Sequence, residues 1–104
     1  MSTPDIERLL ASVPTGLWIG GVERPGSSQF DVLDPSNDQV LISVANATAD
    51  DAIAALDAAC AVQAEWAATP ARERGEILRS VFETIIERAD DLAALMTLEM
   101  GKVF

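Results

Sequence analysis

The chain has 104 residues, 49% of them apolar, and its 17 acidic and 7 basic side chains give a formal charge of −10. That charge repels phosphate backbones and anionic lipids, which argues against nucleic acids and membrane surfaces as partners. No apolar run approaches the ~20 residues that span a bilayer, and the acidic N-terminus does not resemble a secretory signal. A single cysteine excludes an internal disulfide, so we expect a cytoplasmic protein.

Histidine and tyrosine are both missing from the sequence. Their absence removes the commonest general base, the commonest metal ligand and every Ser-His-Asp or Cys-His arrangement. Gly20-Gly21 and Gly26 also fail to match the spacing of a dinucleotide-binding or phosphate-binding loop. Independent catalysis by this chain is therefore not expected.

The first part of the chain, residues 1–47, has the pattern of a short arm followed by β-structure. The arm, residues 1–16, holds one or two amphipathic helical turns that end at a proline and a glycine. Three strands separated by turn-rich clusters are predicted after it, at 17–22, 30–33 and 40–45. We expect these strands to form a small antiparallel meander within residues 17–47.

The second part, residues 48–104, is predicted to form three helices with short connections. Thr48 and Asp51 begin the first helix with a capping-box pattern, and its apolar stripe consists of Ile53, Leu56, Cys60, Ala64 and Ala67. Thr69-Pro70 supplies a cap and a first-turn proline for the second helix, whose apolar face consists of Ile77, Leu78, Val81, Phe82, Ile85 and Ile86. The third helix carries Leu92, Leu95, Met96, Leu98 and Met100 and ends at Gly101, a usual left-handed cap.

These patterns predict an α+β chain in which a short antiparallel β-meander precedes three helices. A three-stranded meander is too small to cover both the stripe of the first helix and the wide face of the second. Apolar surface left uncovered in this way promotes association. We therefore expect the chain alone to fold weakly or to aggregate.

Seven short motifs follow one another in a fixed order: Trp18-Ile19-Gly20-Gly21, Asp34-Pro35-Ser36, residues 51–59, Glu65-Trp66, residues 72–79, residues 90–95 and Leu98-Glu99-Met100-Gly101-Lys102. In order and spacing they resemble the N-terminal segment of the NAD(P)-dependent aldehyde dehydrogenases, from about residue 17 to the last residue. The closing motifs look most like the succinate-semialdehyde dehydrogenase branch. Asp34 stands where the family usually has Asn, and Val103 where it usually has Pro; the first still caps a turn, and the second leaves the helix exit looser.

The resemblance implies that these elements are part of the larger α/β, Rossmann-like fold of that family. It also implies a reaction in which a cysteine thiolate attacks an aldehyde carbonyl, hydride passes to NAD or NADP, and a glutamate-activated water releases the acid. In the family the catalytic Cys and Glu and the coenzyme-binding residues lie in later segments, so none maps onto residues 1–104. The implied partners are the remainder of the dehydrogenase chain and further copies of it in a dimer or tetramer.

Glu99 is the residue of the closing motif that the resemblance connects with a site. In some family members an acidic residue here binds a monovalent cation together with backbone carbonyls that precede the Asn-Pro turn. Carried over, those carbonyls belong to Val32 and Leu33, and oxygen ligands suit such an ion. The alternative interpretation is a helix-end carboxylate that pairs with Lys102 or stays in solvent.

Other reactive or aromatic side chains have structural interpretations. Cys60 lies on the apolar stripe and has no neighbouring histidine or cation in the sequence to activate its thiol, so it is expected to pack as a small hydrophobe. Trp18 and Trp66 are expected to anchor a core or an interface. Arg72, Arg74 and Arg79 alternate with Glu73, Glu76 and Glu83, which favours a solvated helix face over an anion site.

Three interpretations of function follow. The chain is the N-terminal portion of an aldehyde dehydrogenase that oxidises succinate semialdehyde to succinate when full length and is inert as a fragment. It is part of a longer polypeptide that is an active enzyme. Alternatively, it is a free-standing acidic helical module that binds a protein partner through the face at residues 77–86. Whether the reading frame continues after Phe104 into a segment with the active-site cysteine would distinguish between these interpretations.

Overall fold

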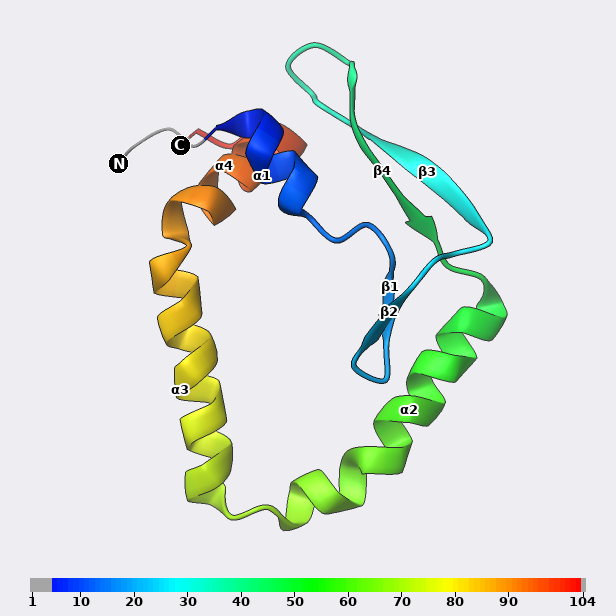
Figure 1. Ribbon diagram of the computed structural model, residues 1–104, viewed down its shortest axis with the longest axis vertical. Helices are drawn as coiled ribbons and strands as arrows, with labels where there is room; N and C mark the ends of the chain where they lie inside the picture. The colour runs from blue at the N-terminus through cyan, green and yellow to red at the C-terminus, as the bar shows by residue number, and fades with distance from the viewer. Residues whose placement is uncertain (1–4, 104) are drawn as a thin grey trace.

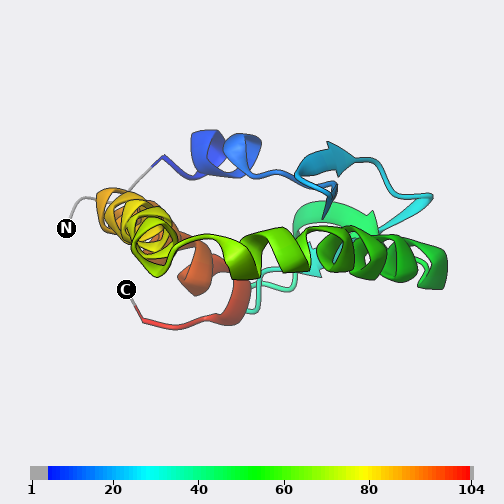
Figure 2. The ribbon, with the colours of Figure 1, turned by 90° about the horizontal axis from the view of Figure 1, so that it is seen from below.

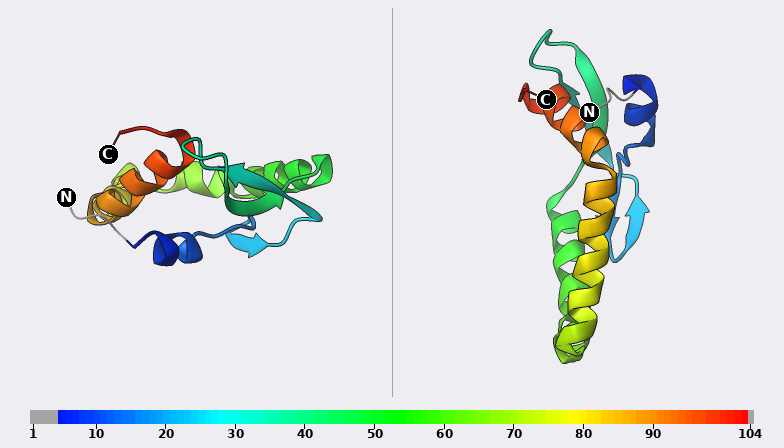
Figure 3. Two further views of the ribbon diagram at one scale, coloured as in Figure 1. Left: turned by 90° about the horizontal axis from the view of Figure 1, so that it is seen from above. Right: turned by 90° about the vertical axis from the view of Figure 1, so that its left-hand side faces the viewer.

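The computed structural model describes residues 5–103, so the first four residues of the predicted arm and Phe104 lie outside the described residues. The elements, in chain order, are α1 (Ile6–Ser12), β1 (Leu17–Ile19), β2 (Val22–Arg24), β3 (Ser28–Leu33), β4 (Val40–Asn46), α2 (Ala49–Ala68), α3 (Ala71–Glu87) and α4 (Ala89–Met100). In Figure 1 they form an open frame, in which α2 and α3 are two long arms that diverge from their junction. Both α1 and the β1–β2 hairpin lie to one side of the layer formed by α2 and α3 (Figures 2 and 3).

The frame is open for a chain of this length. Its radius of gyration is 16.9 Å, whereas a compact domain of this size has about 13 Å. Its accessible surface is 7987 Å², against about 5,600 Å² for a folded monomer of this mass. Among the described residues the buried hydrophobic core consists of Leu9, Ile19 and Ala94. The apolar faces of the long helices therefore remain uncovered, as the sequence predicts.

The strands form two separate hairpins instead of the predicted three-stranded meander. Gly20 and Gly21 both have positive φ angles, 63° and 79°, and form the tight turn between β1 and β2. The predicted strand at 17–22 is therefore folded back on itself, because two successive glycines suit a hairpin turn that needs positive φ at both positions. The second hairpin pairs β3 with β4, so that Phe30 lies opposite Val44.

The helix starts and ends largely follow the sequence signals. Thr48 and Asp51 form the predicted capping box: Asp51 N–H donates to Thr48 Oγ1 at 3.2 Å, and Thr48 N–H donates to Asp51 Oδ2 at 2.9 Å. Gly101 adopts the left-handed conformation (φ 78°) at the end of α4. The last helix begins earlier than expected, at Ala89, and the short helix in the arm is confirmed as α1.

The junction between α2 and α3 differs in one detail from the prediction. Thr69 caps the end of α2 instead of the start of α3, because its Oγ1 donates to the Glu65 carbonyl at 3.0 Å. Its own carbonyl accepts a hydrogen bond from Arg74 Nε at 3.1 Å, across Pro70. Arg74 is half-buried in this corner, so its side chain serves the junction and not the solvated face.

The predicted apolar stripe of α2 faces away from the strands. Ala58 is half-buried and lies 3.8 Å from the position that a Cβ on Gly20 would take, so the alanine side of the helix meets β1. The spacing of the residues puts Ile53, Leu56 and Cys60 on roughly the opposite side of the helix. Ile53 and Leu56 are exposed there, and Cys60 is exposed instead of packed as expected. The alanines pack on the hairpin because they allow a close approach of the two backbones.

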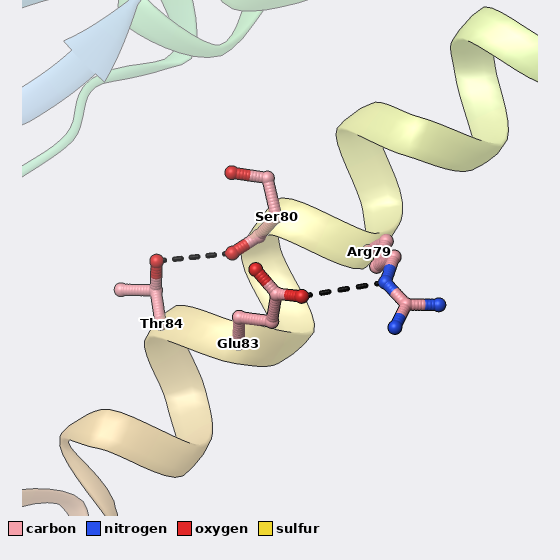
Figure 4. A network of polar contacts seen from close by, with 4 residues as sticks. All are labelled: Arg79, Ser80, Glu83 and Thr84. Atoms are coloured by element: carbon pink, nitrogen blue, oxygen red, sulfur yellow. Dashed lines mark hydrogen bonds and ion pairs between the residues drawn. The ribbon is translucent and has the colours of Figure 1, made fainter.

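The charged side of α3 is solvated, as the alternation of arginine and glutamate predicts. Arg79 Nε donates to Glu83 Oε1 at 3.3 Å, and Thr84 Oγ1 donates to the Ser80 carbonyl at 3.0 Å (Figure 4). The six apolar residues of the opposite side are between 49% and 64% exposed. The helix is therefore strongly amphipathic, yet its apolar side has no partner that buries it in the described structure.

Two glycines of the helices predict opposite effects of substitution by alanine. A Cβ on Gly75, inside α3, would meet nothing within 4 Å, so Gly75→Ala should stabilise the helix by about 0.5–1 kcal/mol. Gly101→Ala should destabilise the chain by about 1 kcal/mol, because φ is +78° and Pro35 Cγ lies 3.5 Å from the new Cβ. Thermal unfolding followed by circular dichroism checks both signs, and an equal effect of the two substitutions would contradict the cap role of Gly101.

The capping box also predicts a pH dependence. The hydrogen bond from Thr48 N–H, and then that with the Thr48 side chain, lower the pKa of Asp51 below its usual value. A carboxyl group whose pKa is lower in the folded than in the unfolded protein stabilises the fold at pH values above its unfolded pKa. This stabilisation is lost as the pH falls through the pKa of the folded state. The helical signal of α2 should therefore weaken below about pH 4, and Asp51→Asn should remove this part of the pH dependence. An unchanged acid titration of ellipticity in Asp51→Asn would contradict the assignment.

Candidate functional site

The predicted cation ligands Glu99 and Val32 come together at a small cavity. It has a volume of about 150 Å³ and is lined by Leu10, Val13, Val32, Leu41, Ile42, Val44, Leu95 and Glu99. The lining residues come from α1, β3, β4 and α4, and Glu99 is the only charged one among them. The third predicted ligand, Leu33, is not among the lining residues.

A β-bulge in β4 lies opposite Val32 and Leu33, the two residues whose carbonyls are candidate ligands. The register of the β3–β4 pair shifts between Val32 and Leu33, since Val32 lies opposite Ile42 but Leu33 lies opposite Val40. A bulge of this kind interrupts the regular ladder of hydrogen bonds and turns peptide groups in new directions. The extra residue of this bulge, Leu41, lies on β4, opposite the Val32–Leu33 pair.

The turn after β3 lies against the end of α4. Asp34 Oδ1 accepts hydrogen bonds from Ser36 N–H at 2.9 Å and from Ser36 Oγ at 2.7 Å, and these bonds lower the pKa of the Asp34 carboxyl. They hold Pro35 in place, where its ring is close to Gly101. This contact between two motifs that are 66 positions apart in the sequence brings β3 and the Glu99 turn of α4 to the same place.

The Glu99 carboxylate is exposed, and in the part of the chain that the structure describes it forms no ion pair with Lys102. The arrangement offers one carboxylate and carbonyl groups opposite a bulge, all hard oxygen donors of the kind that alkali and alkaline-earth cations prefer. Within residues 5–103 there is no cluster of three or more His, Cys, Asp or Glu side chains that could hold a metal ion. A cation at Glu99 would therefore depend on backbone carbonyls and on further ligands such as water.

The other side chains considered for chemistry do not converge on a site. Cys60 is exposed on α2, far along the chain from the cavity that contains Glu99. Trp18 and Trp66 are 61% and 41% exposed, so neither anchors a core within this chain. Nothing in the described residues brings a nucleophile, a base and an oxyanion-binding group together.

A second, larger cavity was not predicted from the sequence. It has a volume of about 510 Å³ and lies between α1 and the start of α4, and its lining includes two arginines and two aspartates, Arg8, Arg88, Asp5 and Asp91. Its charged groups come from segments more than 70 residues apart, so no local sequence pattern could have identified it. The lining residues include two of each sign of charge.

None of the helices within residues 5–103 is both long and apolar enough to cross a lipid bilayer.

Comparison with known proteins identifies the family. The profile of the aldehyde dehydrogenase family matches residues 22–104. The succinate-semialdehyde dehydrogenase of Paenarthrobacter nicotinovorans is 56% identical over 63 residues, which are 61% of this chain and 14% of that protein. The NADP(+) succinate-semialdehyde dehydrogenase GabD of Escherichia coli K12 is 49% identical over 87 residues, which are 84% of this chain and 17% of that protein.

Solved structures agree with this assignment. Betaine aldehyde dehydrogenase from Staphylococcus aureus, in complex with NAD+, superposes with a TM-score of 0.87 at 30% identity over 94% of this chain and 20% of that one. The Delta-pyrroline-5-carboxylate dehydrogenase of Mycobacterium tuberculosis, bound with NAD and cobalamin, gives a TM-score of 0.76 at 30% identity over 89% of this chain and 19% of that one. The hairpins and helices are thus part of the aldehyde dehydrogenase fold.

The chain spans between 14% and 20% of the length of these relatives and solved structures, and it aligns with the N-terminal segment of the succinate-semialdehyde dehydrogenases. Over that segment both the sequence and the backbone agree with theirs. The chain therefore belongs to the aldehyde dehydrogenase family.

Proposed function

We propose that the chain acts as the N-terminal portion of an NAD(P)-dependent succinate-semialdehyde dehydrogenase, which oxidises succinate semialdehyde to succinate. The observation that carries this proposal is its 49% to 56% identity to two succinate-semialdehyde dehydrogenases, together with a frame whose apolar helix faces are exposed. None of the comparisons supports the free-standing interaction module. The oxidation needs a coenzyme that accepts hydride, and we expect the residues that bind it to lie in the remainder of the dehydrogenase chain.

The role proposed for this segment is structural. Its apolar α3 face docks on the remainder of a dehydrogenase chain, which supplies the catalytic Cys, the general-base Glu and the NAD or NADP site. Further copies of that dehydrogenase complete a dimer or tetramer in the cytoplasm. The segment alone binds no coenzyme and catalyses no reaction. The arm at 1–16, the hairpins within 17–47 and the helices of 48–104 then form one docking unit.

A complementation assay tests this role. The 104-residue chain is mixed with an E. coli GabD variant that lacks the 87 matching residues, and NADPH formation from succinate semialdehyde is recorded. Neither polypeptide alone should be active, and together they should recover activity above the background of each part. Phe82→Asp should reduce the recovery at least tenfold, because it puts a charge on the apolar α3 face, which would be worth more than ~1.4 kcal/mol of docking free energy.

Glu83→Gln provides the matched control, because it changes the solvated side of the same helix at the neighbouring position. It should complement as well as the unmodified chain. Activity of the chain by itself would contradict the proposal that it lacks a catalytic site. A failure of the unmodified chain to complement, or equal effects of Phe82→Asp and Glu83→Gln, would contradict the docking role.

The same segment is proposed to hold a monovalent cation, with the Glu99 carboxylate and the carbonyls of Val32 and Leu33 as ligands. Two findings support it: Val32 and Glu99 line one cavity, and a bulge in β4 lies opposite Val32 and Leu33. The cation would connect β3 with the end of α4, at the place where Pro35 also contacts Gly101. Its contribution would therefore be to stability and not to the chemical step.

Potassium dependence of unfolding tests the cation site. A ligand that binds only the folded state raises its stability as its concentration increases. The midpoint of thermal unfolding of a full-length relative should be higher in potassium chloride than in tetramethylammonium chloride at equal ionic strength. Replacing the acidic residue equivalent to Glu99 by alanine should remove that difference, whereas alanine at the position of Glu87 should preserve it. An unchanged potassium effect after the first substitution would rule out the site.

A further inference from the structure

We propose that α3 and α4 are two halves of one helix that has two states. In the structure, α4 is held by α1 and by the turn after β3, and the helix is bent at Arg88. When α4 is released, residues 71–100 form one continuous helix. The switch is made by contacts inside the described chain and is independent of the proposed enzymatic role.

A single residue separates the two helices. The first, α3, ends at Glu87 and α4 begins at Ala89, with Arg88 between them at φ −104° and ψ 18°. A helical residue has ψ near −42°, and at this residue α4 turns away from the axis of α3 (Figure 1). The Arg88 N–H still donates to the Thr84 carbonyl at 3.0 Å, and the Leu92 N–H donates to the Arg88 carbonyl at 3.0 Å. Helical bonding therefore continues on both sides of the bend.

The local sequence does not explain the bend. Sharp bends in helices are usually found at proline or at glycine and serine, whereas residues 87–91 are Glu-Arg-Ala-Asp-Asp. Arg88 makes no side-chain capping bond at the start of α4, and arginine is not among the residues preferred at that position. Asp90 and Asp91 favour a helix start by their charge, but they do not set its direction. The direction of α4 must therefore come from contacts with other elements.

The pattern of side chains continues through the bend. One apolar row crosses it with spacings of four, three and four residues: Ile85, Ala89, Leu92 and Met96. A charged row crosses it on the opposite side: Glu83, Glu87 and Asp90. Such spacings place residues on one side of a single helix. Residues 71–100 thus have the pattern of one amphipathic helix, which would be about 45 Å long.

Contacts with distant segments hold α4 in the bent position. Ala94, in the middle of α4, is 5% exposed, and Leu9 of α1 is 7% exposed. Leu9 lines the same cavity as Leu92, so α1 lies over this side of α4 (Figure 3). At the end of α4, Pro35 lies against Gly101. These partners are 66 or more positions away from α4 in the sequence, so the bend depends on the tertiary fold.

The bend decides whether the two sides of the Glu99 cavity meet. Glu99 lies 11 residues after Arg88, which is about 16 Å along a helix. Straightening at Arg88 would swing Glu99 away from Val32, which lines the same cavity. The bent state keeps the end of α4 beside β3, and the straight state separates them.

Distances between two spin labels test the switch in the 104-residue chain. The labels are attached at two exposed positions by Glu76→Cys and Met96→Cys, after the chain's own cysteine has been removed by Cys60→Ser. Twenty residues of continuous helix span about 30 Å. The variant Ala94→Glu releases α4, because it puts a charge at a buried position and keeps a good helix former there.

The labelled chain without further change should give a distance clearly below ~30 Å, and Ala94→Glu should move it to about that value. The helical signal of circular dichroism should not decrease. Leu9→Asp, which removes the α1 contact without changing α4, should give the same shift. Met100→Glu is the matched control: it adds the same charge to α4 at a position that is 67% exposed, and it should leave the short distance unchanged.

Other results would overturn the proposal. A short distance in both Ala94→Glu and Leu9→Asp would show that the residues around Arg88 encode the bend themselves. Loss of helical signal in these variants would show that residues 71–100 do not form one helix. A long distance in the labelled chain without further change would show that α1 and the turn after β3 do not hold α4. Equal shifts in Ala94→Glu and Met100→Glu would show that release of the buried side is not the cause.

Discussion

The exposed apolar side of α3 is the constraint on which the rest of this structure depends. A helix of 17 residues with a solvated, charged side and an apolar half is stable in water only when the apolar half is covered. The described part of the chain does not cover it, and the same holds for the stripe of α2. The open shape of the molecule is therefore that of a segment whose helices pack on further protein. The solved relatives agree with this, because the segment covers only 19% to 20% of their chains.

Local interactions hold the frame in shape without a large core. The capping box of Thr48 fixes the start of α2, Arg74 fixes its corner with α3, and Pro35 meets Gly101 at the end of α4. Each of these is a contact of a few atoms, worth at most a few kcal/mol. They determine the directions of the helices, but they cannot replace the burial of apolar surface as the main source of stability.

Signals within a few residues of one another can be interpreted from the sequence. The start of α2 at Thr48, the end of α4 at Gly101 and the solvated side of α3 follow from capping and periodicity, and the structure confirms them. The resemblance carried by the seven motifs also identifies the family. The prediction of a continuous strand through Gly20-Gly21 is wrong, although a pair of glycines between short apolar runs is a hairpin signal.

Contacts between distant segments cannot be predicted in this way. The spacing of apolar residues predicts that α2 has an apolar face containing Cys60. It does not show that the β1–β2 hairpin packs on the other side of α2, where the alanines lie. The cavity that joins Val32 to Glu99 is lined by residues of α1, β3, β4 and α4, which are far apart in the sequence, so it has no local signature. For the same reason the cavity beside Arg8 and Arg88 has no counterpart in the prediction.

The described residues leave most of the apolar surface of α2 and α3 uncovered, so they do not supply the burial that a stable domain needs. Denaturant unfolding of the purified chain at several protein concentrations tests this most directly. We expect a low stability at micromolar concentration, because the described residues leave the apolar faces of α2 and α3 exposed. A cooperative transition at the same midpoint at every concentration, with the ~5 kcal/mol or more of an ordinary domain, would contradict this expectation.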